Sequence, residues 1–157
     1  MLLTIEQYAW RIAGPRDFVA NLVINTLVPW WVFREYEWVP LFGEPSAARI
    51  FVPMMAVMTG LTSFGAHAAG IVQRRRGKVS PPWIAGSPWF ASAARCGLTR
   101  GLVAMAVALA LAYSVKQFDP DARVSYWTAN LGLGLSSAVV AYFMHASAMV
   151  RSGMMGR

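Results

Sequence analysis

Two histidines occupy equivalent places in two uncharged, apolar stretches of the chain. His67 follows Ser63 by four residues, and His145 follows Ala141 by four residues. Positions four apart share one face of a helix, so each imidazole is predicted to lie on the same face as a small residue. Each histidine also comes five residues before the last uncharged residue of its stretch, which predicts a common depth for the two rings.

Two imidazoles at one depth on separate helices are suited to binding a tetrapyrrole. They would hold a haem between them as axial ligands, or each would ligate the metal of its own bacteriochlorophyll. The alternative is a structural role, in which each ring forms an interhelical hydrogen bond or reaches water at the membrane surface. His67 and His145 are therefore the candidate cofactor-binding residues, with haem or bacteriochlorophyll as the candidate cofactor.

Other reactive constellations are missing from the sequence. No apolar stretch contains a pair of carboxylates, and the chain has no H-E-x-x-H, no G-x-S-x-G and no phosphate-binding glycine loop. The single cysteine, Cys96, excludes an internal disulfide and a cysteine-rich metal site. We therefore predict no catalytic residue and no metal site.

The elements that position these residues are four stretches without Asp, Glu, Lys or Arg: Val19–Phe33, Ile50–Val72, Gly101–Val115 and Val124–Val150. About 20 apolar residues cross the hydrocarbon core as a helix. Charged residues make up only 13% of the 157 residues, whereas soluble domains have about 25%. The sequence predicts an all-α integral membrane protein, a four-helix transmembrane bundle that forms one domain over 1–157, with spans at about 17–35, 47–72, 95–115 and 124–150.

The residues before the first span are predicted to form a separate amphipathic helix on the membrane surface, at about 3–13. Thr4 and Gln7 have the spacing of a capping box. Gly14 and Pro15 are expected to break this helix from the first span, because proline lacks the amide that a continuing helix needs.

The positive charge is concentrated in three segments, which sets the predicted orientation. Ten of the fourteen Lys and Arg residues lie before the first span, in the middle loop and its flanks, or after the last span: Arg11, Arg16, Arg74, Arg75, Arg76, Lys78, Arg95, Arg100, Arg151 and Arg157. Basic residues of short loops stay in the cytoplasm. We therefore predict a multi-pass protein of the bacterial inner membrane with both termini cytoplasmic, and the net charge of +7 is assigned to topology and not to nucleic-acid binding.

The middle loop carries candidate contact residues for lipids or a partner. The basic run Arg74, Arg75, Arg76 and Lys78 faces an anionic leaflet in this topology. Prolines at 81, 82 and 88 forbid a regular helix over residues 79–90. The aromatic residues there are expected to lie on the membrane or on a partner: Trp83, Trp89 and Phe90.

Small residues at helical spacing are candidates for helix packing, because close backbone approach drives association in hydrocarbon. They are Gly97, Gly101, Ala104 and Ala108 in the third span, and Gly134 and Ala138 in the fourth. They pack either inside one bundle or against another membrane subunit. Asn21 and Asn25 of the first span form interhelical hydrogen bonds or line a polar path.

Three segments carry a resemblance to small four-helix bacterial inner-membrane proteins of unassigned function. They are Asn21-Leu-Val-Ile-Asn25, the turn Val39-Pro-Leu-Phe-Gly43 and the basic run at 74–78. The resemblance implies the topology and no activity. No functional residue is carried over from it.

The expected function is that of a non-catalytic accessory or scaffolding subunit of a larger respiratory or photosynthetic membrane complex. Its expected partners are membrane lipids and other membrane subunits, with no nucleic acid. One alternative is a tetrapyrrole-binding protein for electron transfer or pigment binding through His67 and His145. Another is a small transporter or lipid-handling protein that uses the asparagines of the first span.

Overall fold

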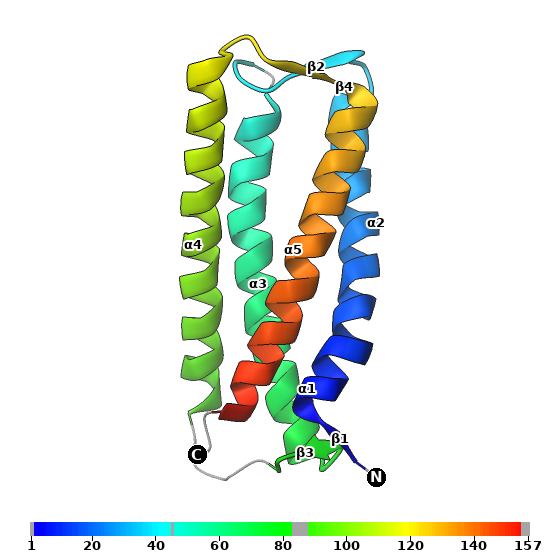
Figure 1. Ribbon diagram of the computed structural model, residues 1–157, viewed down its shortest axis with the longest axis vertical. Coiled ribbons are helices and arrows are strands. Elements are labelled where there is room, and N and C mark those ends of the chain that lie inside the picture. The colour runs from blue at the N-terminus through cyan, green and yellow to red at the C-terminus, as the bar shows by residue number, and fades with distance from the viewer. Residues whose placement is uncertain (1, 45, 83–87, 155–157) are drawn as a thin grey trace.

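The computed structural model describes residues 2–44, 46–82 and 88–154. In this part of the chain four long helices lie side by side (Figure 1): α2 (Gly14–Phe33), α3 (Ala47–Arg75), α4 (Trp89–Phe118) and α5 (Tyr126–Met154). Of these, α3, α4 and α5 are long and apolar enough to cross a membrane. Helices α2 and α4 begin, and helices α3 and α5 end, at the same end of the molecule, which we call the basic end.

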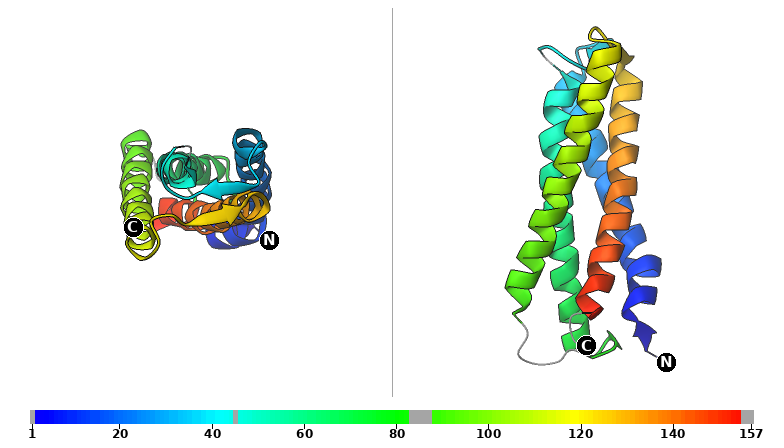
Figure 2. Two further views of the ribbon diagram at one scale, coloured as in Figure 1. Left: turned by 90° about the horizontal axis from the view of Figure 1, so that it is seen from above. Right: turned by 60° about the vertical axis from the view of Figure 1, so that its left-hand side comes forward.

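The helices follow one another in the spatial order α4, α3, α5, α2. Helix α3 packs against α4 on one side and α5 on the other, and α5 packs against α2. Figure 2, viewed from above, shows α2 and α4 at opposite edges of the molecule. The arrangement is therefore an open row of helices, in which each edge helix has one main neighbour.

Two pairs of short strands, which the sequence did not predict, lie among the described residues, one pair at each end of the helices. At the end away from the basic end, β2 (Trp38–Pro40) pairs antiparallel with β4 (Arg123–Ser125). At the basic end, β1 (Leu3–Thr4) pairs in parallel with β3 (Val79–Ser80). These pairs satisfy backbone groups of the connections and tie segments distant in the sequence.

The distribution of side chains is the reverse of that in a water-soluble protein. On α2, Asn25 is 1% exposed, whereas Leu27 is 57% exposed and Trp31 is 64% exposed. In water the apolar side chains would face the interior. Large apolar residues face outward on α3, α4 and α5 as well. This surface fits the hydrocarbon that the three long apolar helices indicate.

Glycines bring α3 and α4 into backbone contact. A Cβ atom at Gly97 would lie 2.7 Å from the carbonyl oxygen of Gly60, and one at Gly101 would lie 2.9 Å from that of Ala56. Close approach of this kind replaces the hydrophobic driving force that is missing in lipid. The first two predicted packing residues of the third span thus face α3.

The other predicted packing residues are also turned inward. A Cβ atom at Gly134 would lie 3.4 Å from Cα of Thr26, so this glycine lets α2 approach α5. Ala138 is fully buried and Ala108 is buried, while Ala104 is half-buried. The small-residue faces therefore serve contacts between helices of this chain.

The prediction of a separate amphipathic surface helix at 3–13 is wrong, because the segment is not separate from α2. The segment consists of α1 (Ile5–Tyr8) and a π-helical turn, η1 (Ala9–Ala13), which runs directly into α2. It is not clearly amphipathic, and its buried residues Ile5 and Ala9 pack against the end of α5. The capping box of Thr4 and Gln7 is confirmed.

The π-turn explains why Pro15 does not break the helix. The amide of Gly14 donates to the carbonyl of Ala9, five residues earlier. The helix is therefore wider than an α-helix just before Pro15, which has no amide hydrogen to donate. Gly14 is also needed for packing, since a Cβ atom there would lie 2.9 Å from Cε2 of Tyr142.

The predicted loop over 79–90 requires a second correction. Val79 and Ser80 form β3, and Trp89 and Phe90 begin α4, six residues before the predicted start of this span. Proline is tolerated just before a helix, so Pro88 marks the start of α4. Trp83 lies outside the described residues.

Candidate functional site

The candidate site is a pocket of about 310 Å³ at the basic end, which we call the α2–α3–α5 pocket. Its walls come from these three helices and from the residues that precede α2: Tyr8, Ile12, Ala13, Arg16, Asp17, Ala20, Ala69, Gln73, His145 and Met149. Four of these side chains carry a charge or an amide or imidazole group. The pocket therefore combines apolar walls with a small polar set, as ligand sites do.

Asp17 and His145 face each other across the contact between α2 and α5. Oδ2 of Asp17 lies 3.3 Å from Nδ1 of His145, and the two side chains are 22% and 16% exposed. Gly14 makes this pair possible because it lets the first turn of α2 press against the Tyr142 ring, one turn before His145 on α5.

Three buried polar atoms of this pocket have no hydrogen-bond partner among the described residues. They are Oδ2 of Asp17, Oε1 of Gln73 and Nε2 of His145. Of these, Oδ2 of Asp17 makes no hydrogen bond but lies within ion-pair distance of Nδ1 of His145. Burying such an atom without a partner costs about 1–3 kcal/mol. Arg16, which lines the same pocket, adds a guanidinium group with several donors. The residues that line the pocket therefore include acceptor groups, on Asp17 and Gln73, and a donor group, on Arg16.

A ladder of side chains continues from Asp17 along the buried face of α2. Nδ2 of Asn21 donates to the carbonyl of Asp17 at 2.9 Å, and Nδ2 of Asn25 donates to Oδ1 of Asn21 at 3.3 Å. These hydrogen bonds run within α2, whereas the sequence suggested bonds between helices. Both amides are buried, so these hydrogen bonds satisfy polar groups inside the molecule.

His67 has different surroundings from His145. It is fully buried, and its Nε2 lies 2.7 Å from Oγ of Ser92 on α4. A Cβ atom at Gly70, one turn further along α3, would lie 3.1 Å from the carbonyl oxygen of Met149 on α5.

That contact places His67 at a depth similar to that of His145, as the sequence suggested, but packs α3 directly onto α5 at this level. His145 lines the α2–α3–α5 pocket and His67 does not. Among the described residues the two rings face different neighbours, since Nε2 of His67 meets Ser92 on α4 and Nδ1 of His145 meets Asp17 on α2. Within the described ranges there is also no cluster of three His, Cys, Asp or Glu side chains that could hold a metal ion.

Arg74 of the predicted lipid-contacting run is buried, which corrects its assignment. It is 2% exposed and donates to the carbonyls of Pro81 at 2.8 Å, Pro82 at 3.0 Å and Ser152 at 2.5 Å. Arg74 therefore fastens the connection after α3 to the end of α5 and does not face lipid. The rest of the run, Arg75, Arg76 and Lys78, is exposed, as are Trp89 and Phe90.

Comparison of the chain with known protein families, curated proteins and solved structures finds no match.

Sequence reasoning found His145 but missed its polar neighbours. The four-residue spacing of Asp17, Asn21 and Asn25 was a usable signal, since it continues one polar stripe down the helix. No signal in the sequence pointed to Gln73 or Arg16, because they join the site only where three helices converge.

Proposed function

We propose that this is a lipid-handling membrane protein that binds a phospholipid with an ethanolamine headgroup in the α2–α3–α5 pocket. The observation that carries the proposal is that Asp17, Gln73 and His145, each with a buried polar atom that makes no hydrogen bond in the described structure, all line one pocket. Ionisable groups turned toward the interior of a membrane protein are functional candidates by default.

The chemistry of the pocket matches this headgroup at both charged ends. The primary ammonium has three N–H donors, which suit the carboxylate of Asp17 and the amide oxygen of Gln73. The lipid phosphate suits the guanidinium of Arg16. The remaining walls are apolar, and the lining residues Ile12 and Ala20 are exposed on the outer side of the helix, which gives acyl chains a way into the hydrocarbon.

The proposal includes α2 as a fourth span in the bacterial inner membrane, with the basic end on the cytoplasmic side. Helix α2 has 20 residues, about 30 Å at 1.5 Å per residue. It lies beside α5 from Gly14, near Tyr142, to Thr26, near Gly134, so the two helices share the same depth. Its asparagines, which lower its hydropathy, face α5 and not lipid. Basic residues gather at the end assigned to the cytoplasm.

The test is to compare two lipids whose headgroup nitrogen carries either three N–H donors or three methyl groups. The full chain in detergent is titrated with phosphatidylethanolamine or with phosphatidylcholine of the same acyl chains, and bound lipid is counted by native mass spectrometry. We expect phosphatidylethanolamine to bind at least about tenfold more tightly, because a trimethylammonium group cannot donate to Asp17 or Gln73.

Variants localise the effect to the pocket. Asp17→Asn and Gln73→Leu are each expected to reduce this preference, whereas Glu6→Gln, which removes an exposed carboxylate near the same end, is the matched control. Equal binding of the two lipids by the unmodified chain would refute the proposal, as would an unchanged preference in both pocket variants.

An accessory subunit of a respiratory or photosynthetic complex is a second candidate. It is favoured by an apolar pocket of about 430 Å³ beside the α3–α4 contact, lined by residues such as Leu61, Phe64, Leu98 and Met105. Extraction in a mild detergent tests it, because an accessory subunit should co-purify with a defined set of membrane proteins. A protein that elutes alone contradicts this candidate.

A further inference from the structure

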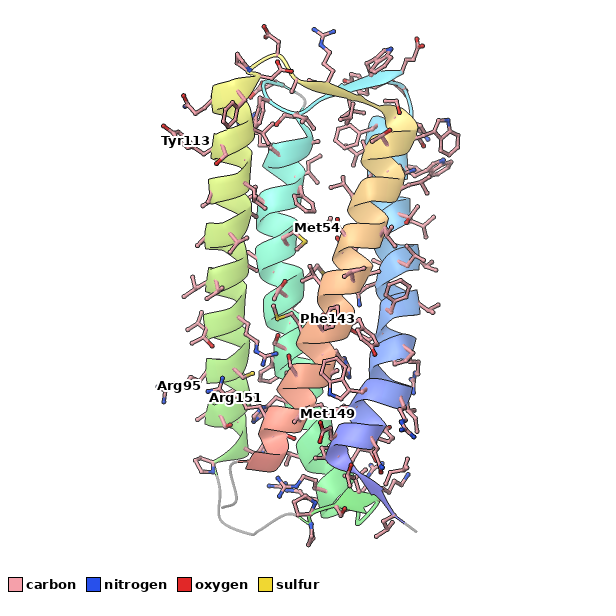
Figure 3. All side chains as sticks on the ribbon, viewed as in Figure 1. Met54, Arg95, Tyr113, Phe143, Met149 and Arg151 are labelled. Carbon is pink, nitrogen blue, oxygen red and sulfur yellow. The ribbon has the colours of Figure 1, made fainter. Side chains whose placement is uncertain are left out.

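A second polar pocket lies at the basic end, between the start of α4 and the end of α5. It has a volume of about 350 Å³ and is lined by Ser92, Arg95, Cys96, Thr99 and Arg151. Figure 3 labels Arg95 on α4 and Arg151 on α5 at nearly the same level. We call it the Arg95–Arg151 pocket; none of its lining residues belongs to the α2–α3–α5 pocket.

The charge of this pocket has one sign. Two guanidinium groups line it and no carboxylate does. In the described ranges, no ion pair joins either arginine to an acidic side chain. Two unneutralised cations at one opening repel each other and attract an anion. An arginine guanidinium presents several N–H groups in a plane, which matches the geometry of a phosphate.

A third arginine, Arg100, follows the lining residue Thr99 on α4 and bonds to α5. Nη1 of Arg100 donates to the carbonyl of Met144 at 2.8 Å and to Oγ of Ser147 at 2.9 Å. These bonds tie α4 to α5 next to Thr99, although the two helices have few other contacts. Arg100 therefore links α4 to α5 beside the pocket.

The level of the pocket along the helices corresponds to that of lipid headgroups. Arg95 lies six residues after the start of α4, about 9 Å, and Arg151 lies three residues before the end of α5, about 4.5 Å. Basic pockets between transmembrane helices on the cytoplasmic side bind anionic headgroups. Above Thr99, the outward residues Leu102 and Val103 of α4 are apolar and exposed, as acyl chains require.

We propose that the Arg95–Arg151 pocket binds the phosphate of an anionic phospholipid of the cytoplasmic leaflet. This site goes beyond the ligand proposed for the α2–α3–α5 pocket, because it selects for net negative charge and contains no acceptor for an ammonium group among its charged residues. The competing explanation is that each arginine only extends its head to the membrane surface. That explanation predicts no discrete lipid stoichiometry and no dependence on the two arginines together.

The experiment uses the full chain in a neutral detergent with phosphatidylglycerol, phosphatidylcholine of the same acyl chains, or inorganic phosphate. Binding is followed by native mass spectrometry and by the midpoint of thermal unfolding, which rises when a ligand binds only the folded state. We expect one tightly held phosphatidylglycerol and a higher midpoint, with little effect of phosphatidylcholine. Phosphate alone is expected to raise the midpoint only weakly, because it lacks the acyl chains.

The paired variant Arg95→Gln/Arg151→Gln is expected to weaken phosphatidylglycerol binding at least about tenfold. Its control is Arg76→Gln/Lys78→Gln, which removes the same charge from exposed positions at the same end. If the paired variant does not fold, the proposal is still tested by two other measurements. They are lipid binding by the single variants Arg95→Gln and Arg151→Gln, and the lipid comparison on the unmodified chain. Equal binding of both lipids, equal losses in the variant and its control, or inorganic phosphate as effective as the lipid would each overturn the proposal.

The proposals for the two lipid sites can be refuted independently of each other. Asp17→Asn is expected to leave phosphatidylglycerol binding unchanged, since Asp17 does not line the Arg95–Arg151 pocket. A loss of phosphatidylglycerol binding in Asp17→Asn would count against two independent sites.

Discussion

Replacing Gly97 by alanine should separate α3 from α4 and destabilise the protein. The added Cβ atom would lie 2.7 Å from the carbonyl oxygen of Gly60 and 3.0 Å from Cβ of Phe64. Ordinary carbon–oxygen contacts begin at about 3.3 Å, so α4 must move outward by about 0.6 Å at this level. The oxygen belongs to the backbone of a helix, and no change of rotamer relieves the contact.

The size of the effect follows from two opposing terms. Alanine is intrinsically better than glycine in a helix by about 1 kcal/mol. Overpacking a close contact costs about 1–3 kcal/mol. Gly65→Ala supplies the control, because it gains the same helical preference on α3 and its Cβ atom meets nothing within 4 Å. The free energy of unfolding of Gly97→Ala should therefore be about 1–3 kcal/mol lower than that of Gly65→Ala.

The assay is reversible unfolding of the purified protein in mixed micelles with increasing denaturing detergent, followed by tryptophan fluorescence. The expected difference corresponds to an equilibrium constant changed about five- to 140-fold, well within the range of the method. If Gly97→Ala and Gly65→Ala unfold at the same detergent fraction, the backbone contact between α3 and α4 is not where we place it.

Three further predictions test other parts of the molecule. Arg74→Met should lower the free energy of unfolding by about 2–4 kcal/mol, because three carbonyls lose a charged donor. Arg76→Met should change it by less than about 0.5 kcal/mol, and thermal denaturation of both variants measures the difference. Reporter domains fused before residue 1 and after residue 157 should both be active in the cytoplasm, and opposite locations would contradict an even number of spans. The protein purified from a haem-replete host should show no Soret band, since His67 faces Ser92 and His145 faces Asp17. A band that is lost in His67→Ala would restore the tetrapyrrole hypothesis.

Much of the fold follows from local features of the sequence. The uncharged apolar stretches predicted α3, α4 and α5, and the capping box of Thr4 and Gln7 is present. The predictions were wrong where a tertiary contact outweighed a local sequence preference. Pro15 normally ends a helix, yet a π-turn carries the chain through it because Ile5 and Ala9 gain burial against α5.

The candidate site was less accessible to sequence reasoning. Arg74 looked like its exposed basic neighbours, and only the fold brings it under the carbonyls of Pro81, Pro82 and Ser152. The paired depth of His67 and His145 was correctly read, but depth does not say which way a ring faces. His67 turns toward Ser92 and His145 toward Asp17.

The sequence by itself determined that the chain forms long helices, three of which are apolar enough to cross a membrane. Their apolarity depends on quantities that add up along the chain, namely the transfer free energies of neighbouring residues. The tertiary structure decided which polar groups meet. Asp17, Gln73 and His145 share a pocket only because α2 and α3 both pack on α5 in a particular register. That register is set by close contacts of glycines and small side chains between helices, and no window of the sequence contains both sides of such a contact.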